Sequence, residues 1–256
     1  AILFLNRRGY AGFVSCRSCG AVLKCPHCDV ALTEHNNGRL VCHYCGYEQP
    51  RVEKCPVCGS PYIGGFKAGT QQIEQVLHKN FPKARILRMD YDTTRAKGSY
   101  EKILSSFAAH EADILVGTQM IVKGHDFPDV TLVGALAADL SLNVADYRCA
   151  ERTFQLLTQA VGRSGRGMKP GEAIIQSYHP DHYSIQAAAA QDYEAFYQEE
   201  MAYRMLMDYP PAAHMLSVLV SGENEELLEQ GMDYLAKFVE RIASRYRIPV
   251  IGPAYA

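Results

Sequence analysis

Several features that mark common protein classes are missing from this chain of 256 residues. No apolar run approaches the roughly 20 residues of a membrane-spanning helix, and no secretory signal is visible. The sequence contains no Gly-Lys dipeptide, so it cannot hold the phosphate-binding loop G-x-x-x-x-G-K-[ST], and it has no Asp-Glu-x-His box. No G-x-G-x-x-G motif follows a predicted strand, which argues against a metal-dependent oxidoreductase.

Net charge is also small, −2 at pH 7, but it is unevenly distributed. Residues 1–178 carry 21 basic and 16 acidic side chains, whereas residues 179–256 carry 5 and 12. The first part therefore suits a polyanionic partner, and the second does not by bulk charge. The chain begins without Met and stops at IPVIGPAYA, inside an expected strand, so we expect it to be a piece of a longer protein.

Eight of the nine cysteines fall into four Cys-x-x-Cys pairs. This spacing lets two thiolates bind one tetrahedral metal ion from a tight turn, and the Pro and Gly residues of CRSCG, CPHC and CPVCG suit such turns. A disulfide framework is disfavoured because nothing marks the chain as secreted. We therefore expect two zinc ions, each bound by four cysteines. The pairs are Cys16/Cys19, Cys25/Cys28, Cys42/Cys45 and Cys55/Cys58.

The segment between the second and third pairs predicts how the pairs combine. DVALTEHNNGRLV, residues 29–41, has two short apolar strands around Asn-Asn-Gly, which indicates a hairpin. A hairpin brings its ends together, so the two inner pairs should share one zinc and the two outer pairs the other. His27 and His43 lie inside Cys-x-x-Cys turns and are less favoured as ligands. Cys149 lies in a distant helical stretch and is expected to be a buried thiol.

In the sequence before and after residues 11–62, apolar strands alternate with helical patterns, as expected of an α/β domain with a parallel sheet. Ligands of such sheets gather at the carboxyl ends of the strands. We therefore expect a discontinuous α/β domain, residues 1–10 and 63–178, with a zinc-binding module, residues 11–62, inserted after its first strand. The predicted strands are 2–5, 86–89, 114–117, 132–136 and 173–178, and the predicted helices are 70–80, 100–110 and 148–161.

Residues 179–256 predict a smaller, incomplete α+β domain. A long helical stretch, residues 183–207, ends at the prolines of DYPP. A strand at 215–222 and a helix at 225–246 with one apolar face follow. IPVIG then begins another strand.

Two stretches carry a resemblance to a known family. ILVGTQMIVKGHDFPDV, residues 114–130, and QAVGRSGRG, residues 159–167, resemble in their order motifs V and VI of superfamily-2 helicases. Q-x-x-G-R-x-G-R is the signature of the second RecA-like lobe of those enzymes. With the eight-cysteine insertion after FLNRRGY, the chain is similar to the bacterial primosomal replication-restart helicases over nearly its whole length. The resemblance implies a RecA-like fold and a bacterial cytoplasmic protein without membrane contact.

The resemblance also implies an ATP-dependent DNA helicase that unwinds in the 3′-5′ direction. ATP with Mg would lie between this lobe and a first lobe that carries the phosphate-binding loop, so the chain alone is expected not to hydrolyse ATP. Arg166 would be the arginine finger, which stabilises charge in phosphoryl transfer, and Arg163 a second phosphate contact. The other residues at the nucleotide would be Gln159, which couples it to DNA, Gly162, Gly124 and Asp126.

Forked or single-stranded DNA is the partner that the resemblance implies, together with single-stranded DNA-binding protein and other primosome proteins. Thr118 and Gln119, at the carboxyl end of a strand, would contact DNA phosphates, and Lys123 would add charge. Thr70, at the start of a helix, is a further candidate for a phosphate contact, although a plain helix cap explains it equally well. An alternative interpretation is a zinc-ribbon module for DNA or protein binding on a catalytically inactive α/β scaffold.

Overall fold

The computed structural model describes residues 1–5, 13–27, 30–35, 38–43, 45–65, 69–122, 127–144, 146–165, 167 and 169–253. Among the predicted site residues, Cys28, Lys123, Gly124, Asp126 and Arg166 lie outside these ranges. The chain divides into two compact units. Unit 1 comprises Ala1–Ala11, Gly65–Val144 and Arg148–Ala202, and unit 2 comprises Gly12–Gly64, Ala145–Tyr147 and Tyr203–Ala256.

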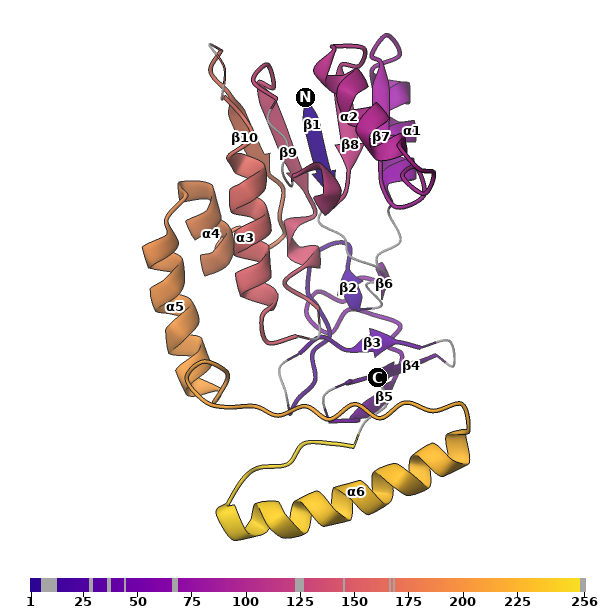
Figure 1. The fold of residues 1–256 in the computed structure, drawn as a ribbon, viewed down its shortest axis with the longest axis vertical. Coiled ribbons are helices and arrows are strands. Elements are labelled where there is room, and N and C mark those ends of the chain that lie inside the picture. Colours follow the sequence, from indigo (N-terminus) through magenta and orange to yellow (C-terminus); the bar gives the residue numbers. More distant parts are fainter. Residues whose placement is uncertain are drawn as a thin grey trace. The chain divides into compact units, whose positions relative to one another are not determined.

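Unit 1 is built on a five-stranded sheet of order β10-β9-β1-β8-β7 (Figure 1). All neighbouring strands run parallel, and Leu3 in the central strand pairs with Val116 on one side and Gly134 on the other. The predicted parallel α/β sheet is therefore confirmed. The strands are β1 (Ile2–Leu5), β7 (Ile86–Met89), β8 (Ile114–Gly117), β9 (Leu132–Leu136) and β10 (Glu172–Ile175).

Helices cover this sheet and complete one apolar core. α1 (Thr70–Asn80) and α2 (Ser99–Ala108) contact β7, while α3 (Cys149–Val161) contacts β9, β10 and α4 (Tyr183–Ala190). Phe4, Leu115 and Leu157 are fully buried in the core, and burial of each such side chain stabilises the fold by about 1.5–3 kcal/mol. Two short 3₁₀ helices, η1 (Gln119–Ile121) and η2 (Ala138–Leu140), follow β8 and β9.

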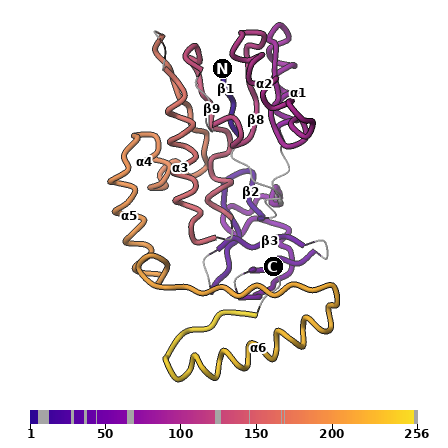
Figure 2. The backbone as a smooth tube through the Cα atoms, in the orientation of Figure 1, coloured from indigo at the N-terminus to yellow at the C-terminus, as the bar shows by residue number. Residues whose placement is uncertain are grey.

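Two boundaries in unit 1 depart most from the predicted ones. β10 stops at Ile175 because the Asp139 carboxylate accepts hydrogen bonds from the Ser177 hydroxyl and from the backbone N–H groups of residues 178 and 179. The predicted helix 183–207 is divided into α4 and α5 (Tyr193–Leu206), as the backbone trace shows (Figure 2). The division falls at Gln191, whose φ is 56°, and the Asp192 carboxylate then accepts the N–H of Ala195 in the first turn of α5.

Unit 2 contains the cysteine-rich segment, which has a small core of its own. β2 (Val14–Cys16) pairs with β6 (Ile63–Gly65), and β3 (Thr33–Glu34), β4 (Arg39–Val41) and β5 (Glu48–Pro50) form a three-stranded antiparallel sheet. The antiparallel pairing of β3 and β4 agrees with the predicted hairpin. Val14, Leu32 and Leu40 are buried among the cysteines, so apolar packing accompanies any metal in holding this segment together.

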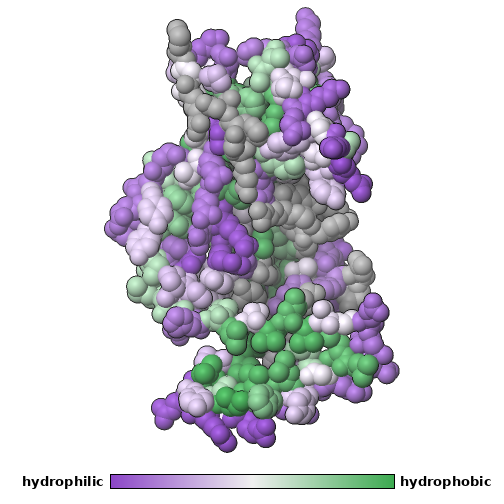
Figure 3. Space-filling model, in the orientation of Figure 1, coloured by the Kyte–Doolittle hydropathy of each residue, from purple (hydrophilic) through white to green (hydrophobic). Residues whose placement is uncertain are grey.

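The remainder of unit 2 contains one long helix, α6 (Glu225–Tyr246), with the predicted bounds. The Asn224 side chain caps it by accepting the N–H of Leu227 at 3.0 Å. Residues 215–222 differ from the prediction, because the structure assigns them no strand. A strand needs a hydrogen-bonded neighbour, and no described residue pairs with this segment. Hydrophobic side chains gather at the surface of this C-terminal part (Figure 3), including Leu216 and Leu219.

No helix among the described residues is long and apolar enough to cross a membrane.

Candidate functional site

The four Cys-x-x-Cys turns share one backbone pattern. In each, the N–H of the first cysteine donates to the carbonyl five residues later, at 2.8 Å. Gly20, Gly46 and Gly59 close three of the turns by donating to the carbonyl of the first cysteine at 2.9 Å, with φ between 71° and 75°. Only glycine adopts this conformation without steric cost. The local sequence C-x-x-C-G therefore specifies a turn that presents two sulfur atoms together.

The sulfur atoms converge in two groups. Within each group all ligand atoms lie within 4.8 Å of one another. The fourth cysteine expected in the second group, Cys28, lies outside the described residues. The outer pairs thus lie together, and so do the described members of the inner pairs. The first group is Cys16, Cys19, Cys55 and Cys58, and the second is Cys25, Cys42 and Cys45.

The spacing of the sulfurs fits a tetrahedral metal ion. Sγ of Cys16 lies 3.6 Å from Sγ of Cys58, and Sγ of Cys25 lies 3.6 Å from Sγ of Cys45. Four sulfurs placed about 2.3 Å from a central zinc would be about 3.8 Å apart. An all-sulfur donor set with this spacing is the chemistry of a structural zinc site. The cysteine groups therefore support zinc binding.

Local electrostatics favour the thiolate form at one of these ligands. Burial raises the pKa of the Cys16 thiol, but the backbone N–H groups of Cys19 and Ser18 and the thiol of Cys58 outweigh burial and lower the pKa to about 6. The Ser18 N–H lies 3.4 Å from the Cys16 sulfur. In the same group the Ser60 N–H lowers the pKa of Cys58, but hydrogen bonds with the thiols of Cys19, Cys16 and Cys55, together with burial, outweigh it and raise the pKa to about 12. Metals bind the thiolate rather than the thiol, and the group therefore favours the thiolate at Cys16 over Cys58.

The two histidines inside the turns make other contacts. The His27 ring lies edge-on to Tyr47, with ring centroids 5.4 Å apart. His43 Nε2 lies 3.3 Å from His35 Nε2. Neither residue belongs to a described group of three or more ligands. Cys149 is half-buried at the start of α3 rather than fully buried.

Thr118 and Gln119 follow the carboxyl end of β8, as the sequence predicts, but they differ in burial. Thr118 has an extended backbone, is half-buried, and donates its N–H to the Met89 carbonyl at 3.4 Å. Gln119 begins η1 and is buried. Thr118 is therefore the better placed of the two for an external ligand.

The glycine-rich stretch after α3 carries the predicted arginines. Gln159 is exposed on α3, and Gly162 forms the C-cap of the helix. The guanidinium Nε of Arg163 donates to the Val122 carbonyl at 3.2 Å. Val122 lies four residues after Thr118, so this bond joins the two stretches that resemble helicase motifs. Arg166 lies outside the described residues.

Two glycines of this loop are required by the packing of the chain itself. A Cβ added to Gly165 would lie 2.8 Å from the Gly171 nitrogen, and one added to Gly167 would lie 2.3 Å from the Pro128 carbonyl oxygen. The Gly165 N–H also donates to the Val130 carbonyl at 3.2 Å. Since β9 and β10 begin just after residues 130 and 171, the loop lies at the amino ends of these strands. It does not share the carboxyl edge with Thr118.

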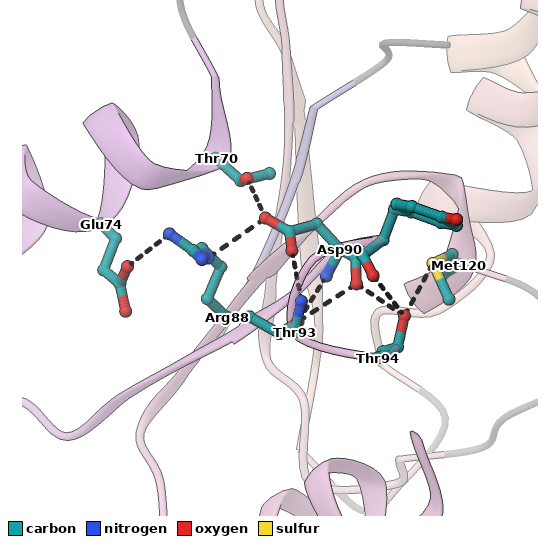
Figure 4. A network of polar contacts seen from close by, with 8 residues as sticks. Thr70, Glu74, Arg88, Asp90, Thr93, Thr94 and Met120 are labelled. Carbon is teal, nitrogen blue, oxygen red and sulfur yellow. Dashed lines mark hydrogen bonds and ion pairs between the residues drawn. The ribbon is translucent and has the colours of Figure 1, made fainter. Parts of the chain in front are cut away.

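A polar network at the end of β7 was not predicted from the sequence (Figure 4). The Asp90 carboxylate accepts the Thr70 hydroxyl at 2.5 Å and lies 3.1 Å from Arg88 Nε, and Arg88 in turn contacts Glu74 at 3.3 Å. Burial raises the pKa of Asp90, but hydrogen bonds from Thr70 and Thr93 and the charge of Arg88 outweigh it and lower the pKa. The signal that points to this network is the run D-x-x-T-T directly after a predicted strand.

This network corrects the helix-cap interpretation of Thr70. The residue is 7% exposed, and its hydroxyl is turned toward Asp90. The N-cap of α1 is Gly69, with no side-chain cap hydrogen bond. The Thr70 hydroxyl is therefore not a helix cap, because the buried carboxylate is its partner. Contact of a DNA phosphate with this helix N-terminus stays a prediction.

Comparison with known proteins adds the family. Residues 25–50 match the PriA DNA helicase Cys-rich region (CRR) domain, and residues 65–168 match the helicase conserved C-terminal domain. The replication restart protein PriA of Bacillus subtilis (strain 168) is 54% identical over 94% of this chain, which covers 30% of that protein. PriA of Synechocystis sp. is 46% identical over 100% of this chain, which covers 31% of that protein. A crystal structure of the yeast DEAD-box splicing factor Prp28 overlaps 59% of this chain and 31% of that one, at 15% identity and a TM-score of 0.33.

Proposed function

The chain belongs to the family of the replication restart protein PriA, and from this premise we propose that it is the second RecA-like lobe and zinc module of an ATP-dependent DNA helicase. It spans about 30% of the length of the B. subtilis and Synechocystis relatives, so the activity proposed is that of a longer protein. The matched helicase domain favours this function over a catalytically inactive scaffold. The observation that carries the proposal is the bond from Arg163 to Val122.

The hydrogen bond from Arg163 to Val122 supports the proposal because it links two stretches of the chain that have different proposed ligands. Arg163 and Arg166 belong to the stretch proposed to reach the phosphates of ATP, and Thr118 to the stretch proposed to reach DNA. A guanidinium carries five N–H donors in one plane, a geometry suited to a backbone carbonyl and a phosphate oxygen together. Movement of one stretch would therefore move the other, which is what a DNA-stimulated ATP hydrolase requires.

In the proposed ATP site, Arg166 stabilises charge that develops during phosphoryl transfer and Arg163 makes a second phosphate contact. Gln159 is exposed next to this loop and is proposed to couple the nucleotide to DNA. Mg would neutralise phosphate charge when bound with ATP. The remaining proposed nucleotide residues are Gly162, Gly124 and Asp126.

On the DNA side, we propose forked or single-stranded DNA as the ligand, with Thr118 and Lys123 as contacts and unwinding in the 3′-5′ direction. Remodelling of stalled forks, assembly of a primosome with single-stranded DNA-binding protein and other primosome proteins, and a place in the bacterial cytoplasm are the corresponding proposals for the whole protein. The two zinc ions would hold the cysteine-rich segment rigid.

The test is DNA-stimulated ATP hydrolysis by the full-length protein with Arg163 replaced. Arg163→Ala should lower kcat by at least tenfold, because both the phosphate contact and the bond to Val122 are lost. Arg163→Lys should restore little, since lysine is a single point charge and cannot form both contacts from one planar group. Arg85→Ala is the matched control, because Arg85 is an exposed arginine of the same unit whose guanidinium binds Asp113. Equal kcat values for the wild type and Arg163→Ala would refute the proposal.

A further inference from the structure

The loop that follows β7 presents an aromatic ring to solvent. Tyr91 is 74% exposed, although it directly follows the nearly buried Asp90. The guanidinium carbon of Arg95 lies over the Tyr91 ring, 5.6 Å from its centroid. Arg95 and Lys97 are both exposed on the same loop. An exposed ring with cations beside it is the side-chain combination that binds unpaired nucleic-acid bases.

Hydrogen bonds around Asp90 hold this loop in one conformation. The Asp90 N–H donates to the Thr93 hydroxyl at 2.9 Å, and the Thr93 N–H donates to the Asp90 carboxylate at 3.0 Å. The Thr94 hydroxyl donates to the Asp90 carbonyl at 2.7 Å. The carboxylate is itself anchored to α1 through Thr70. Tyr91 therefore projects from a turn whose ends are fixed, so little backbone entropy would be lost when a ligand binds its ring.

The ring also lies at the edge of the sheet where the proposed DNA contact is found. Tyr91 follows the carboxyl end of β7, and Thr118 follows the carboxyl end of the neighbouring parallel strand β8. The Thr118 N–H donates to the carbonyl of Met89, two residues before Tyr91. A strand of DNA whose phosphates reach Thr118 would therefore pass close to this loop.

We propose that Tyr91 and Arg95 form a stacking platform for one unpaired base of single-stranded DNA. The base stacks on the phenol ring, while Arg95 and Lys97 attract the backbone phosphates. This proposal rests on the DNA-binding part of the proposed function and adds to it a base-stacking residue in a different loop from the phosphate contacts. Stacking on one aromatic side chain contributes enough affinity that its removal weakens binding by about fivefold to a hundredfold.

The absence of tryptophan from the chain allows a direct test, because Tyr91→Trp would introduce the sole indole. The zinc-loaded variant is titrated with a dT 12-mer and with an abasic 12-mer of equal charge. Quenching of the indole fluorescence by the dT 12-mer and not by the abasic strand is expected. Tyr193→Trp is the matched control, since Tyr193 is 63% exposed in the same unit but belongs to another element, at the start of α5, where its ring contacts Phe154 of α3. Its fluorescence should not change.

Affinity measurements separate this proposal from the function on which it rests. Tyr91→Ala should weaken binding of the dT 12-mer by at least fivefold, and Tyr91→Phe, which keeps the ring, by less than twofold. If the unsubstituted chain binds the 12-mer while Tyr91→Ala binds equally well, or if both strands quench Tyr91→Trp equally, the platform is refuted and DNA binding stands. If neither the unsubstituted chain nor the full-length protein binds the 12-mer, both are refuted, and if only the full-length protein binds it and Tyr91→Ala leaves that binding unchanged, the platform alone is refuted.

Discussion

Replacing Gly165 with alanine should loosen the arginine-bearing loop far more than the same change at Gly98. Both glycines have positive φ, 69° and 80°, and alanine in that region costs about 1–2 kcal/mol. At Gly98 nothing lies within 4 Å of the added Cβ, whereas at Gly165 the Cβ would meet backbone atoms of Gly171 at 2.8 and 3.2 Å. Backbone cannot rotate away as a side chain does, so relief requires a shift that costs about 1–3 kcal/mol more.

The assay is amide hydrogen exchange of β9 and β10, which report local opening beside the loop. The extra cost at Gly165 corresponds to exchange faster by about fivefold to a hundredfold in Gly165→Ala. Gly98→Ala should leave amide exchange in β9 and β10 unchanged. Gly98 lies at the N-terminus of α2, which contacts β7, and β7 is the edge strand opposite β10 in the sheet. If the two variants exchange at the same rate in β9 and β10, the close approach of Gly165 to Gly171 is not a feature of the folded protein.

Three further predictions concern metal, pH and turnover. Elemental analysis should find two zinc ions per chain, reduced to about one in Cys16→Ser and unchanged in Cys149→Ser; two zinc ions in both variants would contradict the assignment of Cys16. Hydrogen bonds from the side chain and backbone of Arg85 lower the pKa of Asp113 from 3.8 to about 2. Between about pH 4 and pH 2 this carboxyl group is therefore protonated in the unfolded chain but still ionised in the folded protein. The free energy of unfolding thus falls as the pH drops from about 4 to 2. Asp113→Asn should flatten that part of a urea-denaturation series against pH, and an unchanged slope would show that this ion pair is not formed. The chain alone should hydrolyse no ATP, because its sequence holds no G-x-x-x-x-G-K-[ST] loop; turnover that survives repurification and is lost in Arg163→Ala would refute this.

Local sequence patterns predicted the strands and helices whose start and end signals lie inside or directly beside them. β1, β7, β8 and β9 have their predicted bounds, and so do α1 and α6, because apolar periodicity and nearby capping residues determine where they begin and end. β10 ends early because Asp139, 38 residues before Ser177, captures the backbone that follows it. Residues 215–222 have a strand pattern, but a ladder partner is a nonlocal requirement that periodicity cannot supply.

The candidate sites also divide into features with a local sequence signal and features that depend on residues distant in the sequence. Cys-x-x-Cys spacing and an intervening hairpin are local, and they anticipated which cysteines the structure groups. The helix-cap interpretation of Thr70 was wrong because the partner of its hydroxyl, Asp90, is 20 residues away and on another element. No sequence signal indicated that Gly165 and Gly167 accommodate other backbone segments of the chain. Polar partners and close approaches between distant segments become visible only when the fold is known.

The most direct test of the proposed helicase function is the rate of DNA-stimulated ATP hydrolysis when Arg166 of the full-length protein is replaced by lysine. An arginine finger contributes on the order of a thousandfold or more to kcat, and lysine cannot reproduce its planar, bidentate fork. We predict that Arg166→Lys lowers kcat by about a thousandfold, while the Kd values for ATP and for fork DNA change by less than tenfold. A kcat within threefold of the wild type would contradict the assignment of this chain as the lobe that completes the ATP site.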